Sequence, residues 1–289
     1  MLPSPIDTIE LFNQTFYYKR DDLIHPMYSG NKYRKLYHYF DNPSDIPIVS
    51  YGGYQSNAML SLAFMCHQQN RECLYLCKTV PENIKEKKYG NLYQARLLGM
   101  QLIEVANSDY QEAIDTLSHT YPHYIIVKQG GATPFAKRGV EILADEIDQF
   151  MQEKKIKELA LFLPSGTGTT ALYLQNALPH STVYTTACVG KSDYLQTQWD
   201  TLDTEAKKPK ILKTIKTYHF AKPYKAFYDF YDLLQKQGVE IDLIYAPKML
   251  QAIQENLEKI PEKNKMILHT GGVLGNSTQI ARYTYKKLI

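Results

Sequence analysis

Residues 158–174 read ELALFLPSGTGTTALYL and predict a strand, a glycine-rich turn and a helix in direct succession. The apolar run at 158–163 is typical of a buried strand, because it has no alternating polar face. The helix follows at 170–177, and the turn at 165–170 connects the two. A buried strand that passes through such a turn into a helix is typical of α/β proteins.

The same alternation extends along the chain on both sides of this segment. Further strands are predicted at 46–51, 73–78, 102–105, 124–127, 183–189 and 266–268, and helices at 58–69, 92–98, 111–119, 139–153 and 248–257. Strands and helices in this order predict a parallel sheet with helices on both of its faces. The fold class is therefore α/β.

Glycines follow four of the predicted strands, as Gly52-Gly53, Gly130-Gly131, Gly166 with Gly168, and Gly271-Gly272. In parallel sheets, ligands bind at the carboxyl ends of the strands, where loops and helix N-termini converge. Glycine lets the backbone approach a ligand closely. We therefore expect a ligand site at these strand ends.

The turn Ser-Gly-Thr-Gly-Thr-Thr at 165–170 has the composition of an anion-binding loop. Its glycines allow amide groups to converge, its threonines add hydroxyl donors, and the following helix N-terminus favours a negative charge. It is neither a Walker A loop, which needs Gly-Lys-Ser/Thr, nor a GxGxxG turn. Phosphate binding is the favoured interpretation, and an ordinary strand-to-helix turn is the alternative.

The segment Ser29-Gly-Asn-Lys-Tyr-Arg-Lys35 places Lys32 just after a turn, at the start of a predicted helix. The positive end of that helix and the charges of Arg34 and Lys35 would lower the pKa of Lys32 and favour the nucleophilic neutral amine. The alternative is that these cations form a solvated basic face, and spacing alone does not decide between the two.

Composition excludes several classes of protein. The 289 residues carry 33 Lys and Arg against 30 Asp and Glu, a net charge of +3, so no basic surface for nucleic acid is indicated. No apolar run approaches the length of a membrane helix. Cys66, Cys73, Cys77 and Cys188 have neither disulfide-framework nor zinc-ligand spacing, and no metal site is predicted. A cytoplasmic protein is expected. The 24 tyrosines and single tryptophan also stand out.

Five ordered motifs together resemble one family. They are Tyr18 to Leu23 with Ser29 to Leu36, then YGGYQSN at 51–57, QGGATP at 129–134, the turn at 165–170 and HTGG at 269–272. This set resembles the fold-type II pyridoxal-phosphate enzymes, and within them the D-cysteine desulfhydrase and 1-aminocyclopropane-1-carboxylate (ACC) deaminase family. The resemblance covers essentially the whole chain.

The resemblance implies a role for each matching residue. Lys32 would hold pyridoxal 5'-phosphate (PLP) as a Schiff base and move protons at the substrate. Asn57 would hydrogen-bond the ring hydroxyl, Ser56 would help bind the substrate carboxylate, and Tyr245 would lie over the substrate. Thr270 would offer a hydroxyl to the pyridine nitrogen. The phosphate would be bound by Gly166, Thr167, Gly168, Thr169 and Thr170.

Each of these residues also has an alternative without chemistry. Asn57 would cap the helix that starts near Ala58, Ser56 would be a turn residue, Thr270 would close a strand, and Tyr245 would be one more core aromatic.

Departures from the family pattern concern the reaction. The segment after Tyr245 reads Ala246-Pro-Lys, so the acidic residue that ACC deaminases have there is missing. Phe220 stands where the family tends to carry a second tyrosine, and Ala58 replaces a histidine. Opening a cyclopropane ring demands well-placed acid and base groups, so these losses argue against ACC deamination.

The resemblance therefore implies a PLP-dependent lyase that carries out α,β-elimination on a small amino acid, with D-cysteine as the expected substrate. An ACC deaminase or another small D-amino-acid eliminase is the alternative within the class. A binding protein for PLP or a phosphorylated metabolite without turnover, and a nucleotide-binding α/β protein, are alternatives outside it.

The family's architecture also implies a domain layout. It is tryptophan synthase β-like, with two parallel-sheet α/β domains and the cofactor between them. The large domain would comprise residues 1–40 and 139–289, and the small domain residues 41–138. Family members are usually homodimers, so a homodimer is expected.

Overall fold

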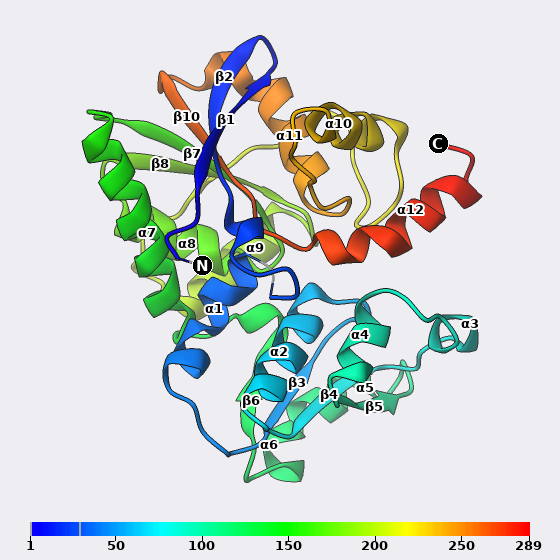
Figure 1. The fold of residues 1–289 in the computed structure, drawn as a ribbon. Coiled ribbons are helices and arrows are strands. Elements are labelled where there is room, and N and C mark those ends of the chain that lie inside the picture. The colour runs from blue at the N-terminus through cyan, green and yellow to red at the C-terminus, as the bar shows by residue number, and fades with distance from the viewer. Residues whose placement is uncertain (1, 29) are drawn as a thin grey trace.

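The computed structural model describes residues 2–28 and 30–289, and in these the strands form two sheets (Figure 1). Ser29, which opens the SGNKYRK segment, lies outside the described residues. The larger sheet has the order β1 (Ile6–Leu11), β2 (Gln14–Lys19), β10 (Asn264–Leu268), β7 (Leu159–Ser165), β8 (Ser181–Ala187), β9 (Lys210–Ile211). The smaller sheet has the order β5 (Gln101–Val105), β4 (Cys73–Lys78), β3 (Ile48–Tyr51), β6 (Ile125–Val127).

The prediction of parallel sheets is confirmed for every strand pair except one. β1 runs antiparallel to β2, and the two form a hairpin whose turn is Phe12-Asn13. Both turn residues have positive φ, 53° and 58°, which is the conformation of a tight hairpin turn. The larger sheet is therefore mixed at this edge, and the sequence pattern did not predict the hairpin.

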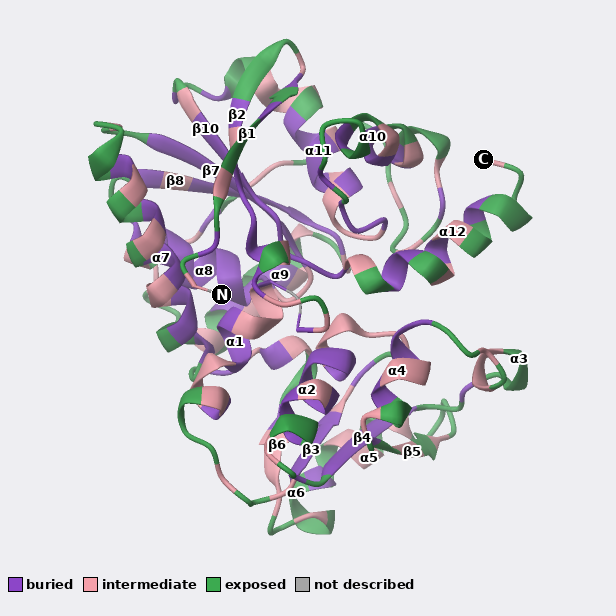
Figure 2. Ribbon diagram, viewed as in Figure 1, coloured by how far each residue is buried: buried purple, intermediate pink, exposed green. Residues whose placement is uncertain are grey.

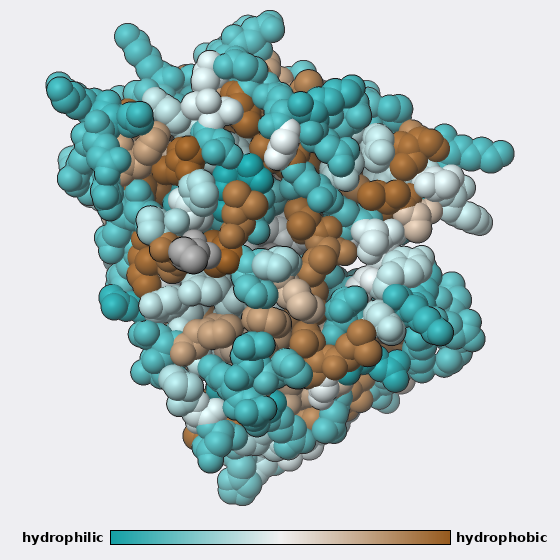
Figure 3. Space-filling view, in the orientation of Figure 1, coloured by the Kyte–Doolittle hydropathy of each residue, from teal (hydrophilic) through white to brown (hydrophobic). Residues whose placement is uncertain are grey.

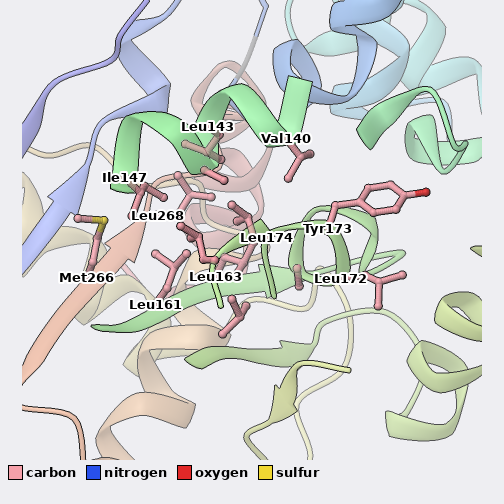
Figure 4. Close-up of a cluster of buried hydrophobic side chains, with 14 of the residues drawn as sticks. Val140, Leu143, Ile147, Leu161, Leu163, Leu172, Tyr173, Leu174, Met266 and Leu268 are labelled. Atoms are coloured by element: carbon pink, nitrogen blue, oxygen red, sulfur yellow. The ribbon is translucent and has the colours of Figure 1, made fainter. Parts of the chain in front are cut away.

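Helices cover both faces of the larger sheet. Successive side chains of a strand point to opposite faces, and both sets are buried in β7. Leu159, Leu161 and Leu163 of β7 pack against α7 (Ala136–Glu153), α8 (Thr169–Ala177) and α9 (Ser192–Leu202) (Figure 4). Ala160 and Phe162, from the same strand, face α10 (Lys225–Gln235), α11 (Ala246–Asn256) and α12 (Asn276–Tyr285). The central strands are accordingly buried along their length (Figure 2).

The smaller sheet is covered in the same way. Its Ile48, Tyr75 and Cys77 face α2 (Asn57–Gln68) and α4 (Asn91–Leu97). Val49, Leu74 and Leu76 face α5 (Tyr110–Asp115) and α6 (Leu117–Thr120). The short α3 (Glu82–Lys85) follows β4. All four cysteines are buried and free.

Two helix predictions need correction. The helix predicted at 111–119 is two helices, α5 and α6, which meet at Thr116. The helix predicted to start at Ala58 begins at Asn57, and Ser56 rather than Asn57 is its N-cap. The Ser56 hydroxyl accepts the amide hydrogens of Ala58 and Met59, at 3.1 and 3.4 Å. Asn57 therefore does not fill the capping role, which leaves its amide for other contacts.

Helix α1 (Gly30–Asp41) is held by a buried network of ion pairs. Arg34 has no exposed surface and donates to Asp21 and to Glu146, each at 2.8 Å. Glu146 of α7 also accepts from Lys19 of β2, at 2.7 Å. Gly139 of α7 lies so close to α1 that a Cβ there would be 2.0 Å from the Arg34 carbonyl oxygen. The position of α1 is thus fixed by the larger sheet and by α7.

All strands of the smaller sheet lie between residues 48 and 127, inside the segment predicted as the small domain. The domain boundaries themselves stay a prediction. In the view of Figure 3 most of the surface is hydrophilic, and apolar residues gather near the middle of the face. Within residues 2–28 and 30–289, the helices lack the length and apolar character needed to cross a bilayer.

Candidate active site

The residues predicted from the sequence line one pocket. Loops after β3 and β6 of the smaller sheet meet loops after β7, β8 and β10 of the larger sheet there, together with the beginning of α1. Carboxyl ends of parallel strands thus converge on the pocket from both sheets. The predicted residues that line it are Lys32, Ser56, Asn57, Gly166, Thr167, Gly168, Thr169, Thr170, Tyr245 and Thr270. Of the four glycine pairs, all but Gly52-Gly53 contribute to the lining.

Lys32 carries a lowered pKa, about 8, and burial is the main cause. The negative charge of Asp242 opposes this shift. Its Nζ donates to Asn31 Oδ1 at 2.9 Å, which holds the amine at the pocket. The direction agrees with the sequence interpretation, but the reason differs, because the Arg34 charge is neutralised by Asp21 and Glu146. Near pH 8 about half of this amine is neutral, and the neutral form is a nucleophile and a base.

Lys35, one helical turn after Lys32, also lines the pocket and is only 4% exposed. The alternative of a solvated basic face is therefore wrong for Arg34 and Lys35. Burial and the charge of Lys32 lower the pKa of Lys35 well below its usual range. A Cβ placed on Gly130 would lie 3.9 Å from Lys35 Nζ. No function of its own was predicted for Lys35, although its i+3 spacing from Lys32 places both on one helix face.

The turn at 165–170 forms a concave group of hydrogen-bond donors at the start of α8. Gly168 is the N-cap of α8 in the left-handed conformation, with φ of 74°, and no side chain caps this helix. The Thr170 hydroxyl is buried and has no hydrogen-bond partner. Thr167 and Thr169 hydroxyls lie 3.0 Å apart. First-turn amides, a positive helix end and an unpartnered hydroxyl together make a site for an oxyanion.

Asn57 is oriented by its neighbour in the smaller sheet's helical layer. Its Oδ1 accepts from Asn91 Nδ2 at 2.7 Å, so its Nδ2 is the group left to donate. A Cβ on Gly272 would lie 2.4 Å from that Nδ2, and Gly272 has φ of 90°, so only glycine fits there. The arrangement leaves an amide donor at the pocket wall.

Thr270 lines the pocket directly after β10, and its backbone contacts the start of α1. The Asn31 amide donates to the Thr270 carbonyl at 3.2 Å. A Cβ on Gly30 would lie 2.6 Å from the Thr270 carbonyl carbon, and Gly30 has φ of 27°. This close contact fixes Lys32, two residues later, relative to Thr270.

Tyr245 is held by Asp242, which accepts the amide hydrogens of Ile244, Tyr245 and Ala246. Burial raises the pKa of Asp242, and these hydrogen bonds oppose the rise. Burial, with Cys188 nearby, raises the pKa of Tyr245, so its phenol stays protonated. The Phe220 ring lies edge-on to Tyr245, with centroids 5.5 Å apart. Tyr245 is thus a donor at the wall of the pocket.

Other pocket residues were not predicted from the sequence. Asn31 and Gln129 lie inside quoted motifs but were given no role, whereas Val189 and Tyr194 lie outside the motifs. No Asp, Glu, Arg or His lines the pocket in the described part of the chain. The described residues of the chain also contain no group of three His, Cys, Asp or Glu side chains that could hold a metal ion.

Comparison with known proteins agrees with this architecture. No protein-family model matches the chain. A Thermotoga maritima protein named "Putative 1-aminocyclopropane-1-carboxylate deaminase" is 22% identical over an alignment of 310 residues with its gaps, which covers 97% of each chain.

Several solved structures share the fold. An ACC deaminase homologue matches with a TM-score of 0.74 at 18% identity, over 96% of this chain and 93% of that one. A hydrogen sulfide-producing enzyme from Fusobacterium nucleatum matches with a TM-score of 0.65 at 14% identity, over 94% of this chain and 95% of that one. A pyridoxal 5'-phosphate-dependent aspartate racemase matches with a TM-score of 0.65 at 13% identity, over 93% of this chain and 90% of that one. The chain has the fold of fold-type II PLP enzymes, which confirms the fold prediction.

Proposed function

We propose that the chain is a PLP-dependent lyase that carries out α,β-elimination on a small, uncharged amino acid, with D-cysteine as the expected substrate. One observation carries the proposal. The Lys32 amine, whose pKa is lowered to about 8, shares a pocket with the unpartnered Thr170 hydroxyl at a helix N-terminus. An amine and an oxyanion site in one pocket suit a cofactor that carries both an aldehyde and a phosphate.

The residues present fit this cofactor. Thr170, which is buried and lacks a hydrogen-bond partner, would donate to the phosphate together with the amides that begin α8. Lys35 lines the same pocket and would donate to the phosphate, whose negative charge would favour the protonated form of the lysine. Asn57 would donate its Nδ2 to the ring hydroxyl, and Thr270 would face the pyridine nitrogen. When bound, PLP withdraws electrons from the α-carbon of an amino acid.

The chain's own residues would bind the substrate and move its protons. Lys32 Nζ would take the proton from the α-carbon, since a neutral amine is a base near pH 8. Ser56 and the backbone of the turn before α2 would bind the carboxylate. The Tyr245 phenol, whose raised pKa keeps it protonated, would donate to the leaving group. D-cysteine would yield sulfide, and uptake of water would give pyruvate and ammonia.

The charges in the pocket limit the substrate. No carboxylate lines it among the described residues, so a cationic side chain would find no partner. The basic residues of the pocket are Lys32 and Lys35, and both would contact the cofactor. An acidic substrate side chain would therefore find no free cation as a partner. This supports a substrate whose side chain is small and neutral, such as cysteine or serine.

ACC deamination is the second candidate, and the Thermotoga relative's name and the ACC deaminase homologue favour it. Phe220 opposes it, because its ring supplies no phenol beside Tyr245. The hydrogen sulfide-producing neighbour favours elimination from cysteine, at the level of the fold.

A panel of substrates tests the proposal. Purified protein should be yellow with bound PLP, and Lys32→Ala should abolish the visible absorption band. Sulfide, pyruvate and ammonia would be measured with D-cysteine, L-cysteine, D-serine and ACC. We expect D-cysteine to react fastest. Colourless protein that takes up no PLP would contradict the proposal, and turnover of any of the four would exclude a binding-only protein.

The resemblance further leads us to propose a cytoplasmic homodimer with the two-domain layout given above. Sedimentation velocity on the purified protein would measure the oligomeric state.

A further inference from the structure

Trp199 is the chain's only tryptophan, and it lies beneath the turn at 165–170. It belongs to α9 and is 1% exposed, within the apolar cluster between α7, α8, α9 and the larger sheet. Its indole Nε1–H donates to the carbonyl oxygen of Gly168 at 3.0 Å. The side chain therefore contacts the loop from the core side, opposite to the pocket.

The contact is too close for any other residue at position 168. A Cβ there would lie 2.4 Å from Trp199 Nε1 and 3.2 Å from Leu195 Cδ2. Gly168 also has φ of 74°, which disfavours a side chain. The glycine of the turn and the indole thus fit each other, and the hydrogen bond is excluded from water.

The hydrogen bond determines where the next amide points. In a trans peptide the carbonyl and the following N–H point in opposite directions. The Gly168 carbonyl accepts both the Trp199 indole N–H and the Leu172 amide at 3.0 Å. The Thr169 N–H must therefore point away from the core, out of the N-terminus of α8, where Thr169 and Thr170 line the pocket.

Without the indole donor, only the Leu172 amide would hold the Gly168 carbonyl. Glycine readily adopts other backbone conformations, and α8 has no side-chain cap. A rotated Gly168 peptide would present its carbonyl oxygen to the pocket and repel a bound anion. The buried Thr170 hydroxyl has no hydrogen-bond partner within the loop, so the loop leaves a donor unused.

We infer that Trp199 is the positioning residue of the phosphate-binding loop: its indole N–H holds the Gly168 carbonyl so that the first amides of α8 donate to a phosphate. That this phosphate belongs to PLP rests on the proposed function. The inference itself concerns the loop and a phosphate group.

The experiment removes one donor without changing the shape of the side chain. Because Trp199 is the only tryptophan, replacing it with 3-benzothienylalanine exchanges the N–H for a sulfur at this site alone. Trp199→Phe is a second variant. Tyr184→Phe is the control, since it removes a buried hydroxyl bond to Glu262 on the opposite face of the same sheet.

Dissociation constants for PLP and for pyridoxal, which lacks the phosphate, would be measured on the apo full-length chain. We expect the benzothienyl variant to bind PLP about five- to tenfold more weakly, the effect of one lost hydrogen bond. Its affinity for pyridoxal should change by less than about twofold, and its bound-PLP phosphorus NMR signal should shift. The Tyr184→Phe protein should match the wild type in all three.

Equal weakening for PLP and pyridoxal, or no weakening, would overturn the inference while the proposed function stands. If the wild type takes up no PLP, the proposed function fails, and inorganic phosphate then decides the inference. Phosphate binding that weakens in the benzothienyl variant supports it. Phosphate binding that is unaffected, or absent in the wild type, overturns it.

Discussion

Lys32 and Lys35 line the same pocket from one turn apart on α1, and they have different surroundings. Lys32 Nζ donates to Asn31, whereas Lys35 Nζ lies near Gly130 and has no carboxylate within ion-pair distance in the described part of the chain. Burial lowers the pKa of both lysines, so an anionic ligand in the pocket would stabilise their protonated forms.

Lys35→Met should separate stability from cofactor binding. Removing a buried amine, whose pKa burial and the charge of Lys32 hold well below its usual range, should raise the free energy of unfolding of the apo protein by about 1 kcal/mol. It should also weaken PLP binding by about 10- to 100-fold, because a charged donor to the phosphate is lost. Urea unfolding and equilibrium dialysis measure the two effects. Lys154→Met, at an exposed lysine, is the control, and a variant that binds PLP normally would contradict the role.

The reaction of Lys32 with PLP should depend on pH near 8. Burial lowers the pKa of Lys32 to about 8, so the neutral amine forms well below the pH at which an ordinary lysine deprotonates. The rate of covalent uptake should therefore rise with pH and level off above about pH 8. Stopped-flow absorbance of the apo protein mixed with PLP measures it. An inflection near the ordinary lysine value of about 10.4 would show that the amine is solvated.

The lowered pKa of Lys32 also predicts whether stability rises or falls with pH. Between the folded pKa and the unfolded value, the unfolded chain binds more protons than the folded one, so stability rises with pH in that window. Below about pH 8 the lysine is protonated in both states, and the cost of its buried charge is fully present. Lys32→Met should reduce this dependence, as urea unfolding at a series of pH values would show, and the remainder would come from Lys35, whose pKa is also lowered.

Thr170→Val tests whether the turn is built for an anion. The Thr170 hydroxyl is buried without a partner, so its replacement by an isosteric methyl group removes an unsatisfied polar group. The apo protein should be as stable as the wild type or more stable, by up to about 1 kcal/mol. PLP binding should weaken about tenfold, while pyridoxal binding should not change. A loss of apo stability would instead indicate a structural role for the hydroxyl.

Arg34→Met should destabilise the fold, because it leaves Asp21 and Glu146 in a buried site without their main partner. Breaking such a pair from one side costs about 3–5 kcal/mol. Exposed Arg138→Met on α7 is the control, with an expected change below about 0.5 kcal/mol. A similar loss in both variants, measured by urea unfolding, would contradict the importance of the network.

Acid unfolding should change in the same variant. Burial alone would raise the pKa of Glu146, but hydrogen bonds and charge from Arg34 and Lys19 lower it below its usual value. Glu146 therefore contributes stability above its unfolded pKa, and this is lost as pH falls through the folded pKa. Without Arg34 the folded pKa rises, so unfolding on acid titration should begin at a higher pH than in the wild type.

Strand-to-helix alternation was sufficient to predict the α/β fold from the sequence, because buried parallel strands are continuous apolar runs. The N-terminal hairpin was missed for a physical reason. Its turn residues Phe12 and Asn13 lack the glycine that signals such turns. Phe12 packs edge-on against Phe16 within the hairpin and against Phe230 of α10, which is distant in sequence. Tertiary packing thus selects a turn that local sequence does not indicate.

The residues of the candidate site were also predicted only in part. Residues inside motifs, such as Lys32 and Thr170, were predicted because turn and helix signals surround them. Lys35 lies inside a motif but was given no role, because its role depends on which residues surround it in the fold. Trp199 was not predicted, because its role depends on what lies beneath a loop. The cause of the Lys32 shift was also missed, since Arg34 is neutralised by residues as distant in sequence as Glu146.

Phe220→Tyr tests which residue restricts the substrate. Phe220 is 50% exposed and lies edge-on to Tyr245, so a hydroxyl there adds a phenol at the site without burying a new polar group. If the missing phenol limits ACC deamination, the variant should raise kcat/KM for ACC by about 10- to 100-fold, the scale of one acid or base group. Its D-cysteine activity should stay within about threefold. Phe135→Tyr, at a phenylalanine of 52% exposure that stacks on His38, is the matched control. An unchanged ACC rate would show that the substrate is selected elsewhere, because ring opening would then lack more than this one donor.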